Sequence, residues 1–141
     1  MKQSILITLL GILTSGAAFS QKEEIKNVKT VISAFAKSAD NSNADQLSTY
    51  LDDNFRIVMN QLFGSTAVSV MTKEIYIEKI RSKEFGGDKR QIEIQNVVIN
   101  GNTACAQVTF KGEKMTFVSL ITLVKNAEGE WKLISDMPIV L

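Results

Sequence analysis

The chain has 141 residues, with 16 lysines and arginines against 15 aspartates and glutamates, 45% hydrophobic residues, one cysteine, one proline and no histidine. This composition is typical of one folded domain and excludes a disordered chain, a collagen and a disulfide-stabilised miniprotein. A formal net charge of +1 provides no dense basic field, so we expect no nucleic-acid partner. Without histidine, and with a single cysteine, metal ligands and the usual base of a serine or cysteine nucleophile are missing, so we expect neither a metal nor a cofactor.

The first 20 residues have the order of a secretory signal peptide. An apolar run over residues 5–13 follows a lysine and precedes small residues, with Ala18 and Ser20 at the expected cut. The run is shorter than the roughly 20 residues that cross a bilayer, and no cysteine follows it for a lipid anchor. We expect cleavage after Ser20, no membrane span, and an exported domain over 21–141, periplasmic or secreted from a bacterium. The alternative is a buried N-terminal helix.

Three helices are predicted in the first half of this domain. Between residues 23 and 39, apolar side chains recur every three or four positions, which is typical of an amphipathic helix. Asn43 and Gln46 have the spacing of a capping box before a second, short helix. Thr72 matches the N-cap of a third helix. The basic residues around the end of that helix, Arg90 among them, are interpreted as a solvated face.

The second half of the domain has strand patterns. Alternation predicts a strand over 55–60 and a short partner over 68–71, and four more strands follow Arg90 as an antiparallel meander. Val98 falls in the same run as Ile92 and Ile94. Pro138 predicts a sheet edge or a strand end. Helices followed by an antiparallel sheet give an α+β fold: three N-terminal helices packed on a four-stranded meander with one or two short strands.

Four short segments, in order, carry a family signature: Leu51–Phe55, Thr72–Tyr76, Val97–Ala104 and Gly129–Ile134. Together they resemble the nuclear transport factor 2-like superfamily, a cone-shaped α+β fold, and within it the branch called "putative lumazine-binding". The resemblance implies a curved sheet around the helices, a pocket between the two, and often a dimer formed through the sheet. Members include isomerases, dehydratases, cyclases and domains with no known catalysis, so the fold alone does not select a function.

The strand after the second helix argues against catalysis. Enzymes of this superfamily such as ketosteroid isomerase place a carboxylate base there, but residues 55–60 contain neither aspartate nor glutamate. Asn60 cannot exchange a proton at neutral pH, and Arg56 stays protonated. We therefore expect a hydrophobic hollow without proton-transfer groups.

Three aspartates remain candidates for a site. Asp52 and Asp53 are adjacent and point in different directions, and a turn at a helix end favours aspartate for local backbone hydrogen bonds. Asp136 lies in the last strand, facing either solvent or the pocket. With Tyr50 or Tyr76 as an orienting hydroxyl, Asp53 or Asp136 defines an alternative function, an isomerase- or dehydratase-like enzyme.

The leading hypothesis is an exported, non-catalytic domain that binds a small apolar or aromatic molecule and forms a homodimer. Its candidate ligand contacts are Asp136 and the aromatic and thioether side chains able to line a cavity: Tyr50, Phe55, Met59, Phe63, Tyr76, Phe117 and Trp131. Cys105, between two alanines, is interpreted as a small hydrophobe pointing away from its strand's apolar face. A third hypothesis is an interaction module whose exposed sheet face carries Val97, Ile99, Val118 and Leu120.

Overall fold

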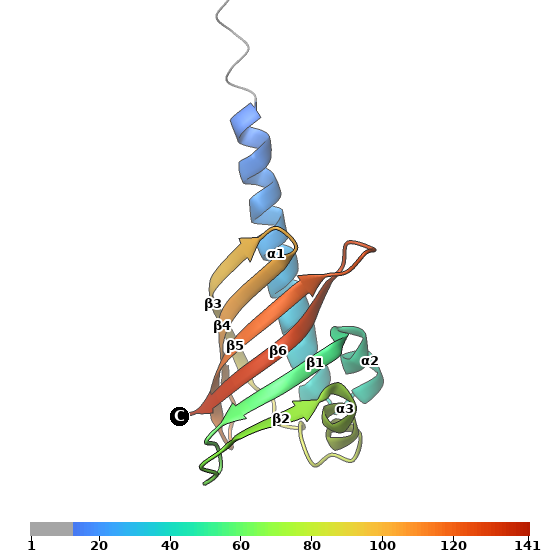
Figure 1. Ribbon diagram of the computed structural model, residues 1–141, viewed down its shortest axis with the longest axis vertical. Coiled ribbons are helices and arrows are strands. Elements are labelled where there is room, and N and C mark those ends of the chain that lie inside the picture. Colours follow the sequence, from blue (N-terminus) through green and yellow to red (C-terminus); the bar gives the residue numbers. More distant parts are fainter. Residues whose placement is uncertain (1–12) are drawn as a thin grey trace, which may run out of the picture.

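The computed structural model describes residues 13–141, with side chains from residue 18 onward. Its helices are α1 (Leu13–Asp40), α2 (Ala44–Thr49) and α3 (Lys73–Arg81). Its strands are β1 (Leu51–Asn60), β2 (Val68–Thr72), β3 (Gln91–Asn100), β4 (Thr103–Lys111), β5 (Thr116–Lys125) and β6 (Trp131–Val140). The strands form one curved sheet, with α1 running along one face and α2 and α3 gathered beside β1 and β2 (Figure 1). The α+β class predicted from the sequence is confirmed.

The sheet has the strand order β2-β1-β6-β5-β4-β3. The meander β3 to β6 and the β1–β2 pair are antiparallel, as predicted, but β1 pairs with β6 in parallel, through Leu51 with Leu133 and Ile57 with Asp136. The sequence predicts both strands without specifying how they pair, because alternation within a strand carries no information on the direction of a partner far along the chain. This one parallel contact joins the first half of the domain to the second.

Helix α1 packs through the amphipathic face that the sequence predicts. Val28, Ile32, Phe35, Ala36 and Ala39 are all buried. The helix begins about ten residues earlier than predicted, at Leu13, and its first turns extend past the edge of the sheet (Figure 1). No helix within residues 13–141 has both the length and the hydropathy needed to span a membrane.

Hydrogen bonds join α1 to the end of β5 and the start of β6. Glu24 Oε2 accepts hydrogen bonds from Lys125 Nζ and from Trp131 Nε1, each at 2.8 Å. The Lys125 ammonium also lies 4.8 Å from the centre of the Trp131 ring, a cation–π distance. The hydrogen bond from Lys125, followed by that from Trp131, holds the pKa of Glu24 below its usual value. The helix is therefore anchored near the start of its buried face.

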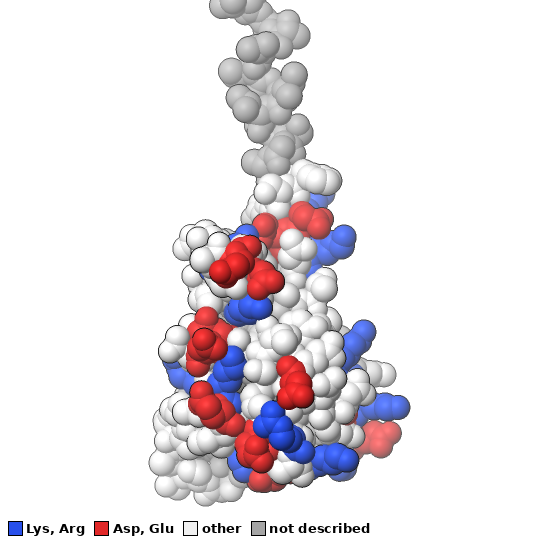
Figure 2. All heavy atoms as spheres, turned by 90° about the vertical axis from the view of Figure 1, so that its right-hand side faces the viewer, with Lys and Arg blue, Asp and Glu red and all other residues white. Residues whose placement is uncertain are grey.

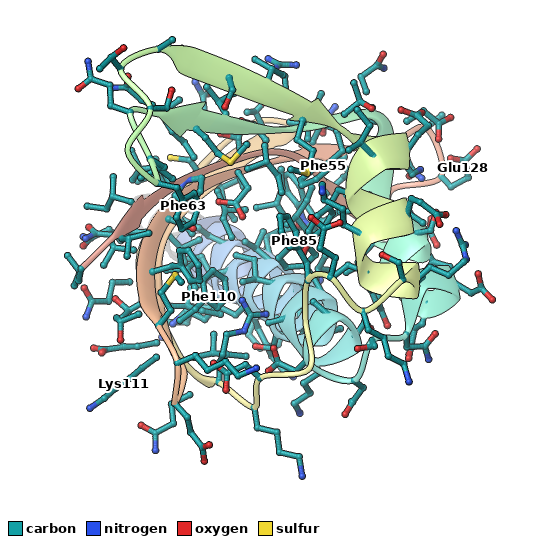
Figure 3. All side chains as sticks on the ribbon, turned by 90° about the horizontal axis from the view of Figure 1, so that it is seen from below. Phe55, Phe63, Phe85, Phe110, Lys111 and Glu128 are labelled. Carbon is teal, nitrogen blue, oxygen red and sulfur yellow. The ribbon has the colours of Figure 1, made fainter. Side chains whose placement is uncertain are left out.

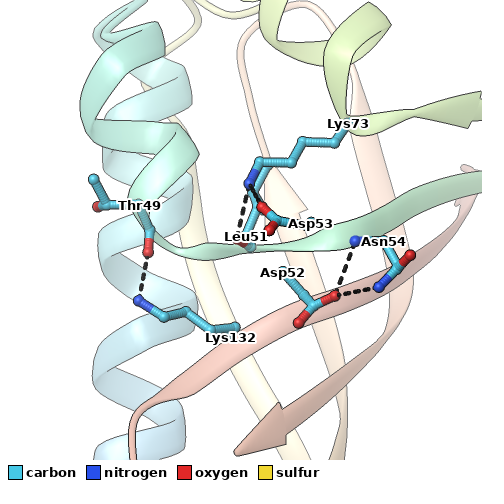
Figure 4. A network of polar contacts seen from close by, with 7 residues as sticks. All are labelled: Thr49, Leu51, Asp52, Asp53, Asn54, Lys73 and Lys132. Atoms are coloured by element: carbon cyan, nitrogen blue, oxygen red, sulfur yellow. Dashed lines mark hydrogen bonds and ion pairs between the residues drawn. The ribbon is translucent and has the colours of Figure 1, made fainter. Parts of the chain in front are cut away.

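The start of β1 is held by local polar bonds (Figure 4). The strand begins at Leu51, four residues before the predicted start, and Asp52 Oδ1 accepts from the Asn54 backbone N–H at 2.9 Å. Lys73 Nζ donates to the Leu51 carbonyl at 3.2 Å and to Asp53 Oδ1 at 3.0 Å. Asp52 thus makes the local backbone bond expected from the sequence, and the almost fully exposed Asp53 carboxylate pairs with a helix residue rather than entering the interior.

A β-bulge in β3 overturns one predicted orientation. The register with β4 shifts between Gln95 and Val98, and Asn96 has a positive φ of 52°. Because an extra residue in a strand changes the face of every side chain that follows, Val97 and Ile99 pack against the core and Val98 is exposed. The expectation that Val97 and Ile99 belong to an exposed sheet face is wrong.

The remaining strand predictions are mostly confirmed. Strand β5 is interior, between β4 and β6, and Cys105 points away from the core. Strand β6 is also interior, and Pro138 lies near its C-terminal end, one of the two places that the sequence allows for it. Proline is tolerated there because it lies beyond Asp136, the last β6 residue paired with β1, where one side of the strand has no partner to bond.

Candidate ligand-binding pocket

A pocket of about 410 Å³ lies between the inner face of the sheet and the helices. Seen from below, the strands curve around α1, and Phe85 and Phe110 point into the space they enclose (Figure 3). The volume is within the usual range for small-molecule sites, roughly 300–1,000 Å³. Apolar side chains from α1, α3, the following loop and five strands supply most of the wall, among them Phe35, Ile57, Met71, Ile80, Phe85 and Phe110.

The aromatic wall is organised around Tyr76 of α3. Its ring centre lies 5.8 Å from that of Phe55, 6.3 Å from Phe35 and 6.5 Å from Phe85, and all three pairs are tilted. Tilted pairs at these distances are favourable because the positive ring edge meets the negative ring face. Burial raises the pKa of the Tyr76 hydroxyl well above its usual value, so the hydroxyl stays protonated at neutral pH.

The pocket contains a buried carboxyl group, Asp136 of β6. Asp136 is 8% exposed, and its Oδ1 is the one buried side-chain oxygen or nitrogen among the described residues that lacks a hydrogen-bond partner. Burial raises the pKa of Asp136 from 3.8 to about 6, against the opposing effects of the Ser119 hydroxyl and the Arg90 charge. The expectation of a hollow without an ionisable group is therefore wrong.

A second β-bulge explains why Asp136 faces inward. Leu133 pairs with Leu123 and Ser135 with Thr122, so Ile134 is an extra residue in β6. Asp136 thereby shares the inner face with Leu133. Its partner in β1 is Ile57. The carboxylate that β1 lacks is thus supplied by the neighbouring strand.

Arg90 is held by Asp40 at the C-terminal end of α1. Its Nε lies 2.6 Å from Asp40 Oδ1, its backbone N–H donates to Asp40 Oδ2 at 3.1 Å, and its guanidinium carbon lies 4.8 Å from the Phe110 ring centre. Both charged side chains are mostly buried. Arg90 is therefore part of the pocket, paired with a carboxylate, instead of belonging to the solvated face expected from the sequence.

The structure gathers part of the predicted set in this pocket: Met59, Phe63, Tyr76, Phe117 and Asp136. Phe63, in the turn between β1 and β2, is 69% exposed at the mouth. Phe55 lies in the core behind Tyr76.

Two predicted residues, Tyr50 and Trp131, border a different hollow. It lies between α1 and the turn before β6, where Glu24 and Lys132 also contribute to its wall. Asp53 borders neither hollow. Of the pairs named for an enzyme, Asp136 with Tyr76 is therefore the one that shares a cavity.

Sequence reasoning missed Phe35, Phe85, Phe110 and Arg90. Phe35 and Phe110 belong to predicted apolar faces, which do not distinguish a cavity wall from solid core. Phe85 and Arg90 belong to a loop, where periodicity gives no orientation. The signal that the sequence offered for this loop was the glycine that follows Phe85. In the structure, Gly86 has a φ of +83°, and a Cβ there would lie 2.3 Å from the Ala39 carbonyl oxygen, so the loop packs closely against the end of α1.

On the face seen in Figure 2, lysines and arginines are interspersed with acids and form no field of one sign. Among the described residues, no three acidic or cysteine side chains are grouped to hold a metal ion. The candidate site is the pocket between the sheet and the helices, because it combines aromatic walls with a buried carboxyl group.

Comparison with known proteins agrees with this architecture. A family model described as "Putative lumazine-binding" matches residues 23–137. A nuclear transport factor 2-like protein of unknown function from Silicibacter pomeroyi is 15% identical, with a TM-score of 0.75 over 86% of this chain and 98% of that chain. A ketosteroid isomerase-like protein from Erwinia carotovora is 18% identical, with a TM-score of 0.67 over 84% and 97%. At these identities the structures show the fold alone. No curated protein matches the chain.

The buried carboxyl predicts a measurable effect on stability. The pKa of Asp136 is 3.8 in the unfolded chain and about 6 in the folded protein. The folded state therefore favours the protonated acid, and this carboxyl lowers the free energy of unfolding progressively as the pH rises from 3.8 through about 6. Asp136→Asn removes this penalty, so the variant should exceed the wild type in free energy of unfolding by roughly 1–3 kcal/mol above pH 7, and the difference should vanish below about pH 4.

Urea unfolding followed by circular dichroism between pH 4 and 8 measures this difference. Asp53→Asn is the matched control, because Asp53 is exposed and should show no comparable pH-dependent gain. An Asp136→Asn difference that does not change with pH would contradict the burial of the charge.

Proposed function

Because the chain belongs to the family described as "Putative lumazine-binding", we propose that it is an exported domain that binds a small, flat, apolar or aromatic molecule between its sheet and its helices. The observation that carries this proposal is the pocket of about 410 Å³, with aromatic walls on several elements and one inward carboxyl group. Such a cavity matches the usual composition of small-molecule sites, which are mostly apolar with a few polar groups that set orientation.

The walls favour a ring-shaped occupant. Phe35 and Tyr76 line the pocket from the helical side, and Phe110 and Phe117 line it from the sheet. An aromatic molecule between them would bury apolar surface at about 25 cal/mol per Å², and it would gain the geometric preference of tilted ring pairs. The exposed Phe63 at the mouth gives such a molecule an apolar path inward.

Filling the pocket should abolish binding. The neutral, flat dye prodan, whose emission shifts to the blue in apolar surroundings, should bind the wild type saturably. Met59→Trp places a large side chain in the cavity and should weaken prodan binding by about tenfold or more, a difference of about 1.4 kcal/mol. Fluorescence titration measures both affinities.

The matched control makes the same substitution on the opposite face. Met137 points outward from β6, so Met137→Trp should leave prodan binding within about twofold of the wild type, well under 1.4 kcal/mol. Equal losses in both variants, or no saturable blue shift in the wild type, would contradict binding in this pocket.

The export part of the proposal is supported by the position of the expected cut. Residues 18–23 are exposed, and Val28 is the first buried residue of α1. Removal of residues 1–20 would therefore take no described core residue, and the anchor at Glu24 would remain.

The mature protein should begin at Gln21. Intact-mass spectrometry of the protein recovered from an exporting bacterium measures its N-terminus, and a small-to-large change at the cut, Ala18→Leu, should block processing because a signal peptidase requires small residues there. A wild-type product that keeps Met1 would contradict export by this route.

A second candidate function is self-association through the outer face of the sheet. Four apolar side chains form cross-strand pairs there, Leu120 with Met137 and Val118 with Ile139. Leu120, Met137 and Ile139 are exposed, and Val118 is partly so. Contiguous apolar surface of this kind often marks a protein interface. We therefore propose a homodimer in which these pairs meet their copies.

Light scattering after size exclusion should give about twice the monomer mass for the wild type. Leu120→Lys introduces a charge into the centre of the patch and should give a monomer, because an unpaired charge is costly to bury in an interface. Ile75→Lys, at an exposed position of α3, should leave the dimer intact. A monomeric wild type at tens of micromolar would end this proposal.

A further inference from the structure

We propose that the pocket selects a protonated amine, in the form of an apolar ring-bearing molecule whose ammonium group donates to Asp136. This inference rests on the proposed function, since it names the class of molecule that the same pocket binds.

The first observation is the unsatisfied oxygen. Asp136 Oδ1 is buried, lines the pocket and accepts no hydrogen bond from any described residue. A buried acceptor without a donor is rare in folded proteins, because the group loses its bonds to water and gains none in return. A molecule that brings an N–H donor to this oxygen completes the bond that the protein leaves open.

The second observation is the balance of charge around that oxygen. The groups that act on Asp136 are Arg90, Tyr76 and Ser119. Tyr76 stays protonated, and a serine hydroxyl is neutral. Arg90 is engaged by Asp40 at 2.6 Å and donates to the Ala36 carbonyl at 3.3 Å. The guanidinium that acts on Asp136 is thus already paired with another carboxylate, that of Asp40.

The mouth does not supply the missing cation. Its charged residues are Glu84, Asp88 and Lys114, two acids and one base. Glu84 pairs with Lys79, and Asp88 accepts the backbone N–H groups of Glu113 and Lys114. No described lysine or arginine forms an ion pair with Asp136, so a cation that pairs with it would have to come with the bound molecule.

The third observation is the chemistry of the walls. The negative faces of aromatic rings attract cations, and rings grouped around a small cavity are a known means of recognising ammonium groups. Two rings of this pocket already bind cations of the protein: Arg90 lies 4.8 Å from the Phe110 centre and Lys79 lies 5.1 Å from that of Phe85. Aromatic walls with one unpaired carboxylate match an ammonium group on an apolar body.

The pH dependence distinguishes this class from a neutral one. The pKa of Asp136 is about 6, so the group is mostly ionised at pH 7.5. An ammonium group requires the ionised carboxylate and should bind less tightly as the pH falls through about 6. A neutral carbonyl compound would need the protonated acid and should bind more tightly over the same interval.

The test uses two probes that differ in one group, 2-phenylethylamine and 2-phenylethanol, titrated calorimetrically into the mature protein. The amine should bind the wild type at pH 7.5 about tenfold more tightly than the alcohol. Asp136→Asn should remove that preference by lowering the affinity for the amine about tenfold while leaving the affinity for the alcohol within about twofold. Asp53→Asn, which removes a charge that borders neither hollow, should leave the preference in place.

The outcomes separate this inference from the proposed function. Equal binding of both probes to the wild type, an amine preference that survives Asp136→Asn, or amine binding that strengthens below pH 6 would each overturn the amine assignment. If prodan still binds saturably in those cases, the pocket function stands without the amine. If prodan does not bind either, the pocket function itself fails.

Discussion

The parallel pairing of β1 with β6 is the contact on which the architecture of the pocket depends. It joins the strand that follows the short helix to the last strand of the meander, two segments about half the chain apart. Through it, α3 and the loop after it are placed opposite the inner faces of β4 and β5. The same register places Asp136 beside Ile57. A sheet that ended at β6 would leave the pocket without the wall formed by β1 and β2.

The two buried carboxyl groups near Arg90 differ in their hydrogen bonding. Asp40 and Arg90 satisfy one another at the end of α1, whereas Asp136 keeps an oxygen without a donor. An ionised group held in this state lowers the stability of the folded protein, and groups with strongly shifted pKa values are concentrated at functional sites. The same carboxyl, with a pKa of about 6, has the properties required of a general acid or base near neutral pH. Asp136 is thus the residue on which both a binding role and the isomerase- or dehydratase-like alternative would depend.

Local patterns in the sequence predicted the helices and most strands because each depends on a short window of residues. The face of α1 follows from the spacing of Val28, Ile32 and Phe35, and the outward position of Cys105 follows from strict alternation in β4. The family resemblance added the curved sheet and the pocket. The orientation of Asp136 could not be predicted in this way, because it depends on one extra residue, Ile134, and on how β5 pairs around it. The partnership of Arg90 with Asp40 joins residues fifty positions apart, which no periodicity reports.

The bulge at Ile134 also makes the polarity of the cavity sensitive to chain length. Removing a single residue there would restore simple alternation, turn Asp136 toward solvent and bring a neighbour of different chemistry inward. The cavity could thus lose its inward carboxyl group through a one-residue deletion, without any substitution at Asp136 itself. The length of β6, and not only its residue types, therefore sets the chemistry that the cavity offers.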